Sequence, residues 1–157
     1  MFKMYAYKGF AGSGKSLKLI EEVKGIMHEQ ERVLVLTADR PSSDWMKRLQ
    51  EVPGKPHVKY RIPLYLVVQN VKDFNRAVST LFAYLYKEGK TPEVIVFDLN
   101  LKEENRSQIN FIHDIGRMLN SPTIYYTIQT DDLNMELDVE TFTYQTYLES
   151  KEGNRNG

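Results

Sequence analysis

The feature that most constrains the fold of this chain is the segment GFAGSGKS at residues 9–16, which separates a strand pattern from a helical pattern. Residues 3–8 alternate and are rich in tyrosine, as in a β-strand, whereas residues 16–29 carry apolar side chains at helical spacing. Glycines in the turn let the backbone curl so that successive N–H groups point inward, and the following helix adds the positive end of its dipole. This arrangement predicts a concave site for phosphate groups.

The same segment matches the pattern G-x-x-x-x-G-K-[ST] at every position, which predicts a P-loop that binds ATP and Mg²⁺. Lys15 is expected to reach the β- and γ-phosphates, and the Ser16 hydroxyl to ligate Mg²⁺. The predicted nucleotide-binding residues are Gly9, Phe10, Ala11, Gly12, Ser13, Gly14, Lys15, Ser16 and Leu17.

Strand and helix patterns alternate along most of the chain. Further strands are predicted at residues 32–37, 64–69, 93–100 and 123–129, and further helices at 41–51, 71–88 and 103–119. This alternation predicts an α/β fold, a three-layer α/β/α sandwich with a mainly parallel central sheet.

Several details of these helices are predicted as well. Pro41 should lie near the start of the 41–51 helix, with Ser42 or Ser43 as its cap, and Gly89 should end the 71–88 helix. The side chains expected to point inward from the 103–119 helix are Ile109, Ile112, Ile115, Met118 and Leu119.

The last part of the chain has a different character. The acidic stretch 131–140 is interpreted as a solvated loop, and residues 141–149 alternate as a strand does. We expect a single P-loop NTPase domain over residues 1–150 and a flexible tail over 151–157.

Composition narrows the function classes. Among 157 residues, Lys plus Arg and Asp plus Glu balance at 21 each, so net charge gives no reason to expect wholesale nucleic-acid binding. A local basic run at residues 46–61 is either a solvated loop or a contact for nucleic acid or nucleotide phosphates. The absence of cysteine excludes disulfides and thiolate metal sites. Without a signal-peptide core or a long apolar run, the chain is expected to be cytoplasmic, with no membrane partner.

An acid is needed beside the magnesium of a P-loop, and Asp98 is the candidate. It follows the apolar run of a predicted parallel strand, so it should face the edge of the sheet where ligands bind. We expect Asp98 to hold Mg²⁺ through water. A second acid, Asp39, lies just past the strand that follows the P-loop helix.

With these residues in place, the chain resembles the RecA-like branch (ASCE superfamily) of P-loop ATPases over roughly residues 3–130. The resemblance implies that Asp39 orients the attacking water, that Lys15 and Gln129 contact the γ-phosphate, and that the chain is an ATPase. It also implies action near DNA in recombination or replication, with DNA or a DNA-bound protein and a second copy of the chain as candidate partners. Asp39 is shorter than the glutamate usual in this family.

Enzymes of this family often use an arginine from a neighbouring subunit. Arg106 and Arg117 are the candidates for that role, although both also fit a solvated helix face. Two alternatives to an ATPase remain open. A nucleoside or nucleotide kinase would use the same P-loop, but the cysteine set and Asp-Glu pair of thymidine kinases are absent. An ATP-binding interaction module with weak hydrolysis would fit the leucine, rather than glutamate, that follows Asp98.

The remaining candidates are aromatic residues and histidines. Trp45, with Arg40 and Arg48, fits either core packing or stacking on a base. The three histidines are scattered without metal-ligand spacing, so no metal other than magnesium is expected.

Overall fold

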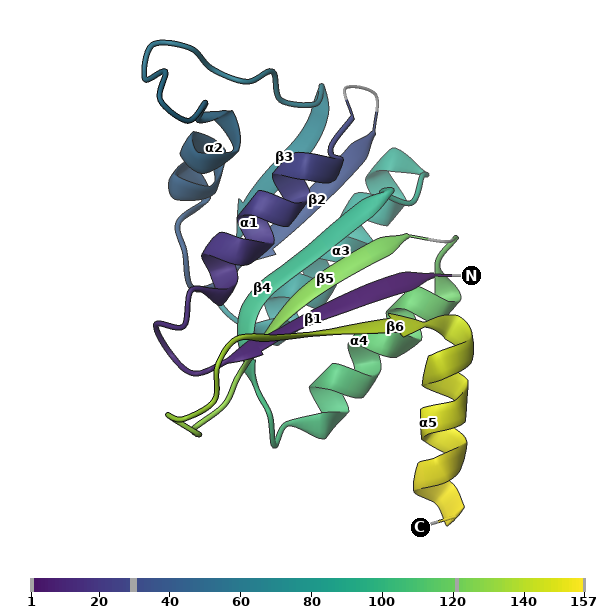
Figure 1. Cartoon of the computed structure of the whole chain (residues 1–157). Coiled ribbons are helices and arrows are strands. Elements are labelled where there is room, and N and C mark those ends of the chain that lie inside the picture. Colours follow the sequence, from purple (N-terminus) through teal and green to yellow (C-terminus); the bar gives the residue numbers. More distant parts are fainter. Residues whose placement is uncertain (1, 29–30, 121, 157) are drawn as a thin grey trace.

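The computed structural model of the chain describes residues 2–28, 31–120 and 122–156, the last four of these by their backbone only. In this part of the chain a six-stranded sheet has the order β3-β2-β4-β5-β1-β6 (Figure 1). The strands are β1 (Lys3–Gly9), β2 (Arg32–Thr37), β3 (Tyr65–Asn70), β4 (Val94–Lys102), β5 (Thr123–Gln129) and β6 (Asp138–Thr143). The helices are α1 (Lys15–Ile26), α2 (Ser42–Gln50), α3 (Phe74–Glu88), α4 (Arg106–Met118) and α5 (Tyr144–Asn156).

The sheet is parallel except at one edge. Strands β1 to β5 pair in parallel, and β6 pairs antiparallel with β1. The prediction of an α/β fold with a mainly parallel sheet is therefore confirmed. Because parallel strands end at a common edge, the segments that follow β1, β2, β4 and β5 are brought together there.

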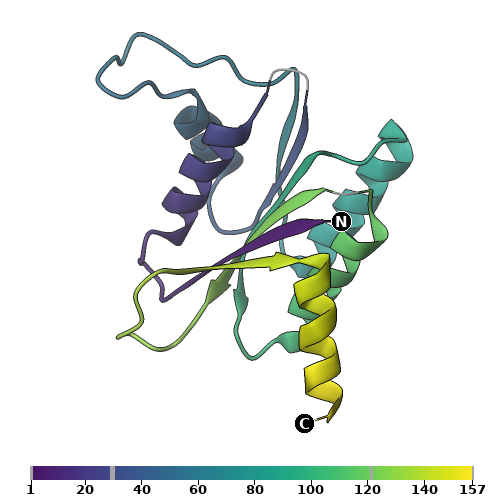
Figure 2. The same ribbon diagram turned by 45° about the vertical axis from the view of Figure 1, so that its right-hand side comes forward.

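Helices cover both faces of the sheet, as a three-layer arrangement requires (Figure 2). Helices α1 and α2 pack on one face, where Leu19, Val23 and Trp45 are buried against the sheet. Helices α3 and α4 pack on the other face, where Leu81 and Ile112 are buried. The two apolar clusters on opposite faces explain why the central strands read as continuous apolar runs.

Helix α2 starts differently from its prediction. Its N-cap is Pro41, and no side chain caps it, so the prediction of Ser42 or Ser43 as the cap is wrong. The backbone N–H of Ser42 instead donates to the side-chain oxygen of Asn70 at 2.8 Å. A neighbouring strand end therefore satisfies a donor that a local serine was expected to satisfy.

Three other helix predictions shift at their ends. Helix α1 ends at Ile26, and residue 29, the last of its prediction, lies outside the described residues. Helix α3 begins at Phe74 because the Asp73 carboxylate accepts from the Arg76 N–H at 2.9 Å, and it ends at Gly89 as predicted. Helix α4 begins at Arg106, after β4 has continued beyond Asp98 to Lys102.

One inward prediction on α4 is wrong. Ile109, Ile112 and Ile115 are buried as expected, but Met118 is 63% exposed. Nine residues are about two and a half helical turns, so Met118 lies opposite Ile109 on the helix. Side chains at every third position therefore move progressively around the helix, and the last of them points away from the core.

The strand predicted over residues 141–149 is also wrong in part. Strand β6 begins at Asp138, inside the predicted acidic loop, and α5 begins at Tyr144. The Thr143 hydroxyl accepts from the Thr146 N–H at 3.3 Å, which starts the helix as a local cap. The Tyr147 ring then packs 6.4 Å from the ring of Phe2. The division into one domain and a flexible tail stays a prediction.

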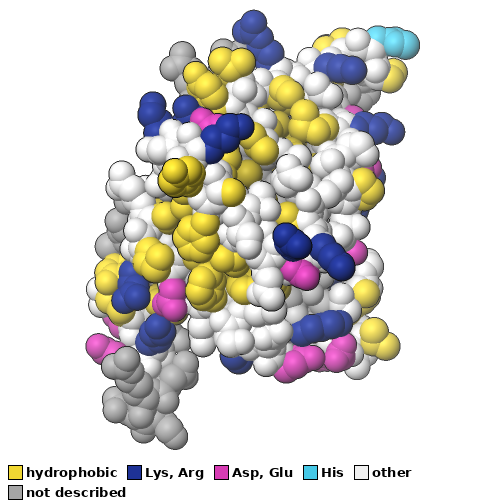
Figure 3. Space-filling model, turned by 180° about the vertical axis from the view of Figure 1, so that it is seen from behind, with side chains coloured by type: hydrophobic (Ala, Val, Ile, Leu, Met, Phe, Trp, Pro, Cys, Tyr) yellow, Lys and Arg dark blue, Asp and Glu magenta, His cyan; other side chains and the backbone are white. Residues whose placement is uncertain are grey.

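The surface over α3 and α4 carries exposed apolar side chains, which Figure 3 shows among white and charged ones. They are Phe82, Tyr86, Phe111 and Met118. In the part of the chain that is described, no helix is long and apolar enough to cross a membrane.

Candidate functional site

The loop between β1 and α1 has the backbone shape that its glycines predict. Gly12 and Gly14 have φ values of 83° and 85°, in the left-handed region that glycine adopts without strain. Gly14 is also the N-cap of α1, and no side chain caps this helix. A Cβ at Gly9 would collide with Ser13 Oγ and lie 3.1 Å from Ser13 Cβ. The loop is therefore tightly folded around the start of α1, with that helix terminus open to an anion.

Two polar groups of this loop are suited to take a ligand. Ser13 Oγ is buried, and among the described residues it has no hydrogen-bond partner. Lys15 is only 5% exposed, and its Nζ donates to the Phe10 carbonyl at 3.3 Å. Burial lowers the pKa of Lys15, while the charges of Asp39 and Asp98 raise it. A buried ammonium with such limited pairing is stabilised by an arriving anion.

Asp98 lies beneath the loop, in contact with Ser16, a residue 82 positions earlier in the chain. Its carboxylate accepts from Ser16 Oγ at 2.9 Å, from Trp45 Nε1 at 3.1 Å and from Thr127 Oγ1 at 3.2 Å. Burial raises the pKa of Asp98, and these three hydrogen bonds oppose that rise because they stabilise the ionised form. The structure thus brings together the two residues that the sequence predicts for magnesium.

Asp39 is exposed just beyond β2, and Asn100 holds it. The Asn100 Nδ2 donates to Asp39 Oδ2 at 2.5 Å, while the buried Asn100 Oδ1 has no partner in the described part of the chain. Asn100 has a φ of 48° and lies where the β4–β5 pairing shifts register, between Phe97 and Leu101. This bulge turns the amide toward Asp39, so an exposed carboxylate has a defined position at the edge of the site.

Gln129 is the last residue of β5 and is half-buried. It pairs with Gly9 of β1 on one side and with Lys102 of β4 on the other. Because β5 lies between β1 and β4, Gln129 is level with the start of the loop and on the strand next to that of Asp98. The sequence predicts a polar side chain at this strand end, and the strand order accounts for its nearness to the loop.

The two arginine candidates differ in position. Arg106 is exposed in the first turn of α4, directly after β4, on the edge of the sheet that carries the loop. Arg117 is exposed in the last turn of α4, at the other end of the helix. Of the two, only Arg106 lies on the side of the molecule where the site is.

The donors at Ser16 and Asp98 fit magnesium. Both offer oxygen, and Mg²⁺ in proteins is typically held by one or two carboxylates together with substrate phosphates and water. Among the described residues no group of three or more His, Asp or Glu side chains gathers as a metal site. A magnesium ion here would therefore depend on phosphate oxygens for much of its coordination.

Some residues of the site had two interpretations in the sequence, and others were missed. Of the two interpretations of Trp45, core packing is confirmed and stacking on a base is wrong, because its side chain is fully buried and its N–H donates to Asp98. Arg40 and Arg48 both pair with Asp44 instead. Thr127 and Asn100 were not predicted at all. The one signal in the sequence was the polar Thr127 inside the run IYYTI of residues 124–128.

Comparisons of the chain with family models, with curated proteins and with solved structures found no match.

Proposed function

We propose that this chain binds Mg²⁺-ATP at residues 9–17 and hydrolyses it, as a P-loop ATPase of RecA-like type. The observation that carries the proposal is the hydrogen bond from Ser16 to the buried Asp98, directly beneath a glycine loop that ends in the buried Lys15. These are the hydroxyl, carboxylate and ammonium that phosphate and magnesium binding require, and the carboxylate comes from a part of the chain distant from the other two.

Binding is assigned first. The loop N–H groups and the start of α1 cradle the phosphates, and Lys15 Nζ exchanges the Phe10 carbonyl for phosphate oxygens. The unpaired Ser13 Oγ gains a partner at the same time. Ser16 and Asp98 would hold Mg²⁺, which supplies neutralisation of charge on the β- and γ-phosphate oxygens.

Hydrolysis is assigned to Asp39 and Gln129. Asp39 is exposed, and Asn100 fixes it, so its carboxylate can accept a hydrogen bond from a water molecule beside the γ-phosphate. The water oxygen bonds to the γ-phosphorus while the bond to the bridging oxygen breaks, and the proton leaves with the released phosphate. Gln129, beside Gly9 in the sheet, would contact the γ-phosphate. Action on DNA, in recombination or replication, is part of this proposal.

The test is nucleotide binding followed by turnover. Calorimetry should detect ATP binding that needs Mg²⁺, and Lys15→Ala should lower the affinity by roughly 100-fold or more, because it removes a buried charge-assisted contact. The matched control is Lys18→Ala, which removes an exposed lysine of the same helix. Equal ATP affinity in Lys15→Ala and Lys18→Ala would refute the assignment of the loop.

Turnover distinguishes the three function classes. Release of phosphate that stops in Asp39→Ala is the result expected for the ATPase. Transfer of phosphate to an added nucleoside would instead identify a kinase. Tight binding without release under any condition, including with single-stranded DNA, would identify an ATP-binding interaction module.

A further inference from the structure

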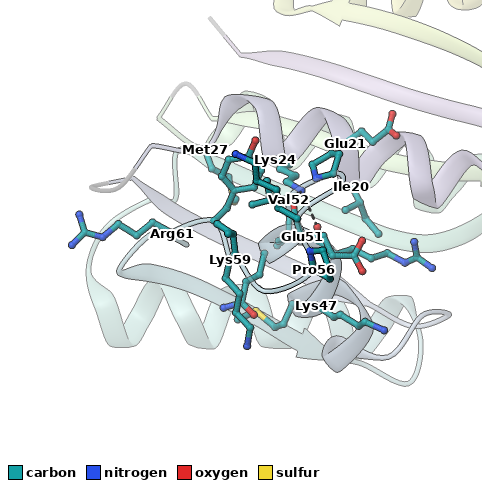
Figure 4. Close-up of a pocket in the computed structure, with 18 of the residues that line it drawn as sticks. Ile20, Glu21, Lys24, Met27, Lys47, Glu51, Val52, Pro56, Lys59 and Arg61 are labelled. Carbon is teal, nitrogen blue, oxygen red and sulfur yellow. Dashed lines mark hydrogen bonds between the residues drawn. The ribbon is translucent and has the colours of Figure 1, made fainter.

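A large hollow on the described surface lies between α1, α2 and residues 51–61 (Figure 4), and of the residues assigned to the nucleotide only Leu17 lines it. Its volume is about 1370 Å³, and it is open to solvent. Leu17, Ile20 and Lys24 line it from α1, and Lys47 lines it from α2. We name it the α1–α2 groove.

The wall formed by residues 51–61 is held in place by hydrogen bonds. Glu51 and Lys59 form an antiparallel bridge, and the Tyr60 N–H donates to the Gln50 carbonyl at 2.8 Å. Lys24 Nζ reaches across from α1 to the carbonyls of Arg48, at 3.3 Å, and Glu51. The groove is therefore built before a ligand arrives, which lowers the entropic cost of binding.

Positive charge gathers at this groove although the whole chain is neutral. Among the described residues, its lining includes six basic and two acidic side chains. The basic ones are Lys24, Lys47, Arg48, Lys55, Lys59 and Arg61, and the acidic ones are Glu21 and Glu51. Figure 4 shows Lys47, Lys59 and Arg61 extending outward from the rim. A row of cations along an open groove is complementary to an extended polyanion.

Apolar and aromatic surface lies between these charges. Tyr60 is 50% exposed, with Lys24 Nζ 4.7 Å from its ring centroid on one side, and Val58 and Leu17 are exposed nearby. Exposed rings and apolar side chains beside a basic track are what unstacked bases require, whereas an acidic peptide would use the charges alone. A duplex would keep its bases stacked inside and leave this surface unused.

We propose that the α1–α2 groove binds single-stranded nucleic acid, with the exposed Lys47, Lys55 and Lys59 on the phosphates and Tyr60 against a base. This names the partner of the proposed ATPase. It rests on that proposal only for the link to phosphate release, because strand binding itself needs no nucleotide.

The link to the P-loop would run through α2. This helix presents Lys47 to the groove, and its buried Trp45 donates to the Asp98 carboxylate beneath the loop. A strand that shifts α2 therefore changes the hydrogen bonds of the carboxylate assigned to magnesium. We expect single strands to change the rate of phosphate release.

The direct test is fluorescence anisotropy of a labelled oligothymidylate with the full chain and no nucleotide. Lys55→Glu/Lys59→Glu should weaken binding by roughly tenfold or more, and it should reduce the slope of log affinity against log salt by about 0.7 for each phosphate that the protein no longer neutralises. The matched control is Lys87→Glu/Lys90→Glu, the same charge change on exposed lysines in the last turn of α3 and just after it. This control should bind within about twofold of the unaltered chain.

Several results would overturn the groove assignment. They are equal weakening in both double variants, tighter binding of a duplex than of the single strand, and displacement of the strand by polyglutamate as readily as by unlabelled oligothymidylate. Circular dichroism of each variant excludes misfolding as the cause. Lys15→Ala separates the two proposals, since retained strand binding without ATP binding in that variant supports the groove. Strand binding by an unaltered chain that does not bind ATP would refute only the ATPase.

Discussion

Asp98 shows how one buried carboxylate organises the candidate site. Its ionised form is costly in the interior, and the hydroxyls of Ser16 and Thr127 and the indole of Trp45 offset that cost. These donors come from α1, β5 and α2, so three elements are tied to one residue. A change in any donor alters both the stability of the fold and the availability of the carboxylate to a cation.

At the residue scale, Trp45→Phe tests whether the hydrogen bond from the indole to Asp98 stabilises the fold and the candidate cation site. The variant keeps an aromatic ring but loses the N–H, so Asp98 loses a donor and its pKa rises further. We expect a loss of roughly 1–3 kcal/mol in the free energy of unfolding, measured in urea by circular dichroism. The Mg²⁺ concentration needed for ATP binding should also rise, and acidification should abolish binding at a higher pH than in the unaltered chain.

The control for this prediction is Leu49→Ala, which removes another buried side chain of α2 that packs in the same cluster. It should lower stability by about 2–5 kcal/mol without changing the magnesium requirement of the folded protein. If both variants change the magnesium requirement alike, the indole has no role beyond packing.

At the scale of the element, the loop of residues 9–16 depends on a close approach between its two ends. Gly9 ends β1, and its Cα faces Ser13 so closely that a methyl group has no room. The side chain of Ser13 fills this space, and its hydroxyl has no hydrogen-bond partner among the described residues. The shape of the loop therefore depends on the pair, not on the glycine alone.

Gly9→Ala should strain the loop by about 1–3 kcal/mol and weaken ATP binding, because the added methyl group displaces Ser13. The double variant Gly9→Ala/Ser13→Ala removes the colliding hydroxyl. Gly9→Ala should therefore cost less stability when it is made in Ser13→Ala than when it is made in the unaltered chain. Thermal unfolding and calorimetry of the four proteins form a double-mutant cycle. A coupling energy of zero would show that the two residues do not interact.

At the scale of the whole molecule, α5 packs against α4 beside the sheet. The His113 ring on α4 stacks on Tyr147 of α5 at 4.8 Å and forms a hydrogen bond with the Tyr126 hydroxyl at 2.9 Å. Burial lowers the pKa of His113 to about 4, although the nearby Asp114 opposes the shift and Lys151 adds to it. The imidazole is thus held neutral in the folded chain.

The consequence is a loss of stability in mild acid. An unfolded histidine takes up a proton near its usual pKa of 6.5, whereas the folded one does so only near 4, so unfolding is favoured as pH falls between these values. The stability contribution is complete above pH 6.5 and declines by up to roughly 3 kcal/mol toward pH 4. Urea unfolding at several pH values should show this slope, and His113→Gln should flatten it. An unchanged slope in the variant would assign the effect to the carboxylates.

Local patterns determined a large part of this protein. The strands, the P-loop motif and the end of α3 at Gly89 depend on periodicity, backbone freedom and helix termination, which nearby residues decide. The same holds for the position of Asp98 near the end of an apolar run. Asp39, Asp98 and Gln129 were found from the sequence because parallel strands end at one edge, whereas Thr127 and Asn100 were not found.

Tertiary structure decided the contacts that complete the site. The order β4-β5-β1 puts Gln129 beside Gly9, a bulge turns Asn100 to Asp39, and the packing of α2 brings Trp45 to Asp98. The helix at residues 144–156 likewise replaced an alternating pattern, because a threonine cap and the packing of Tyr147 outweighed strand propensity. None of these contacts follows from spacing along the chain, since each depends on which strands pair and in what register.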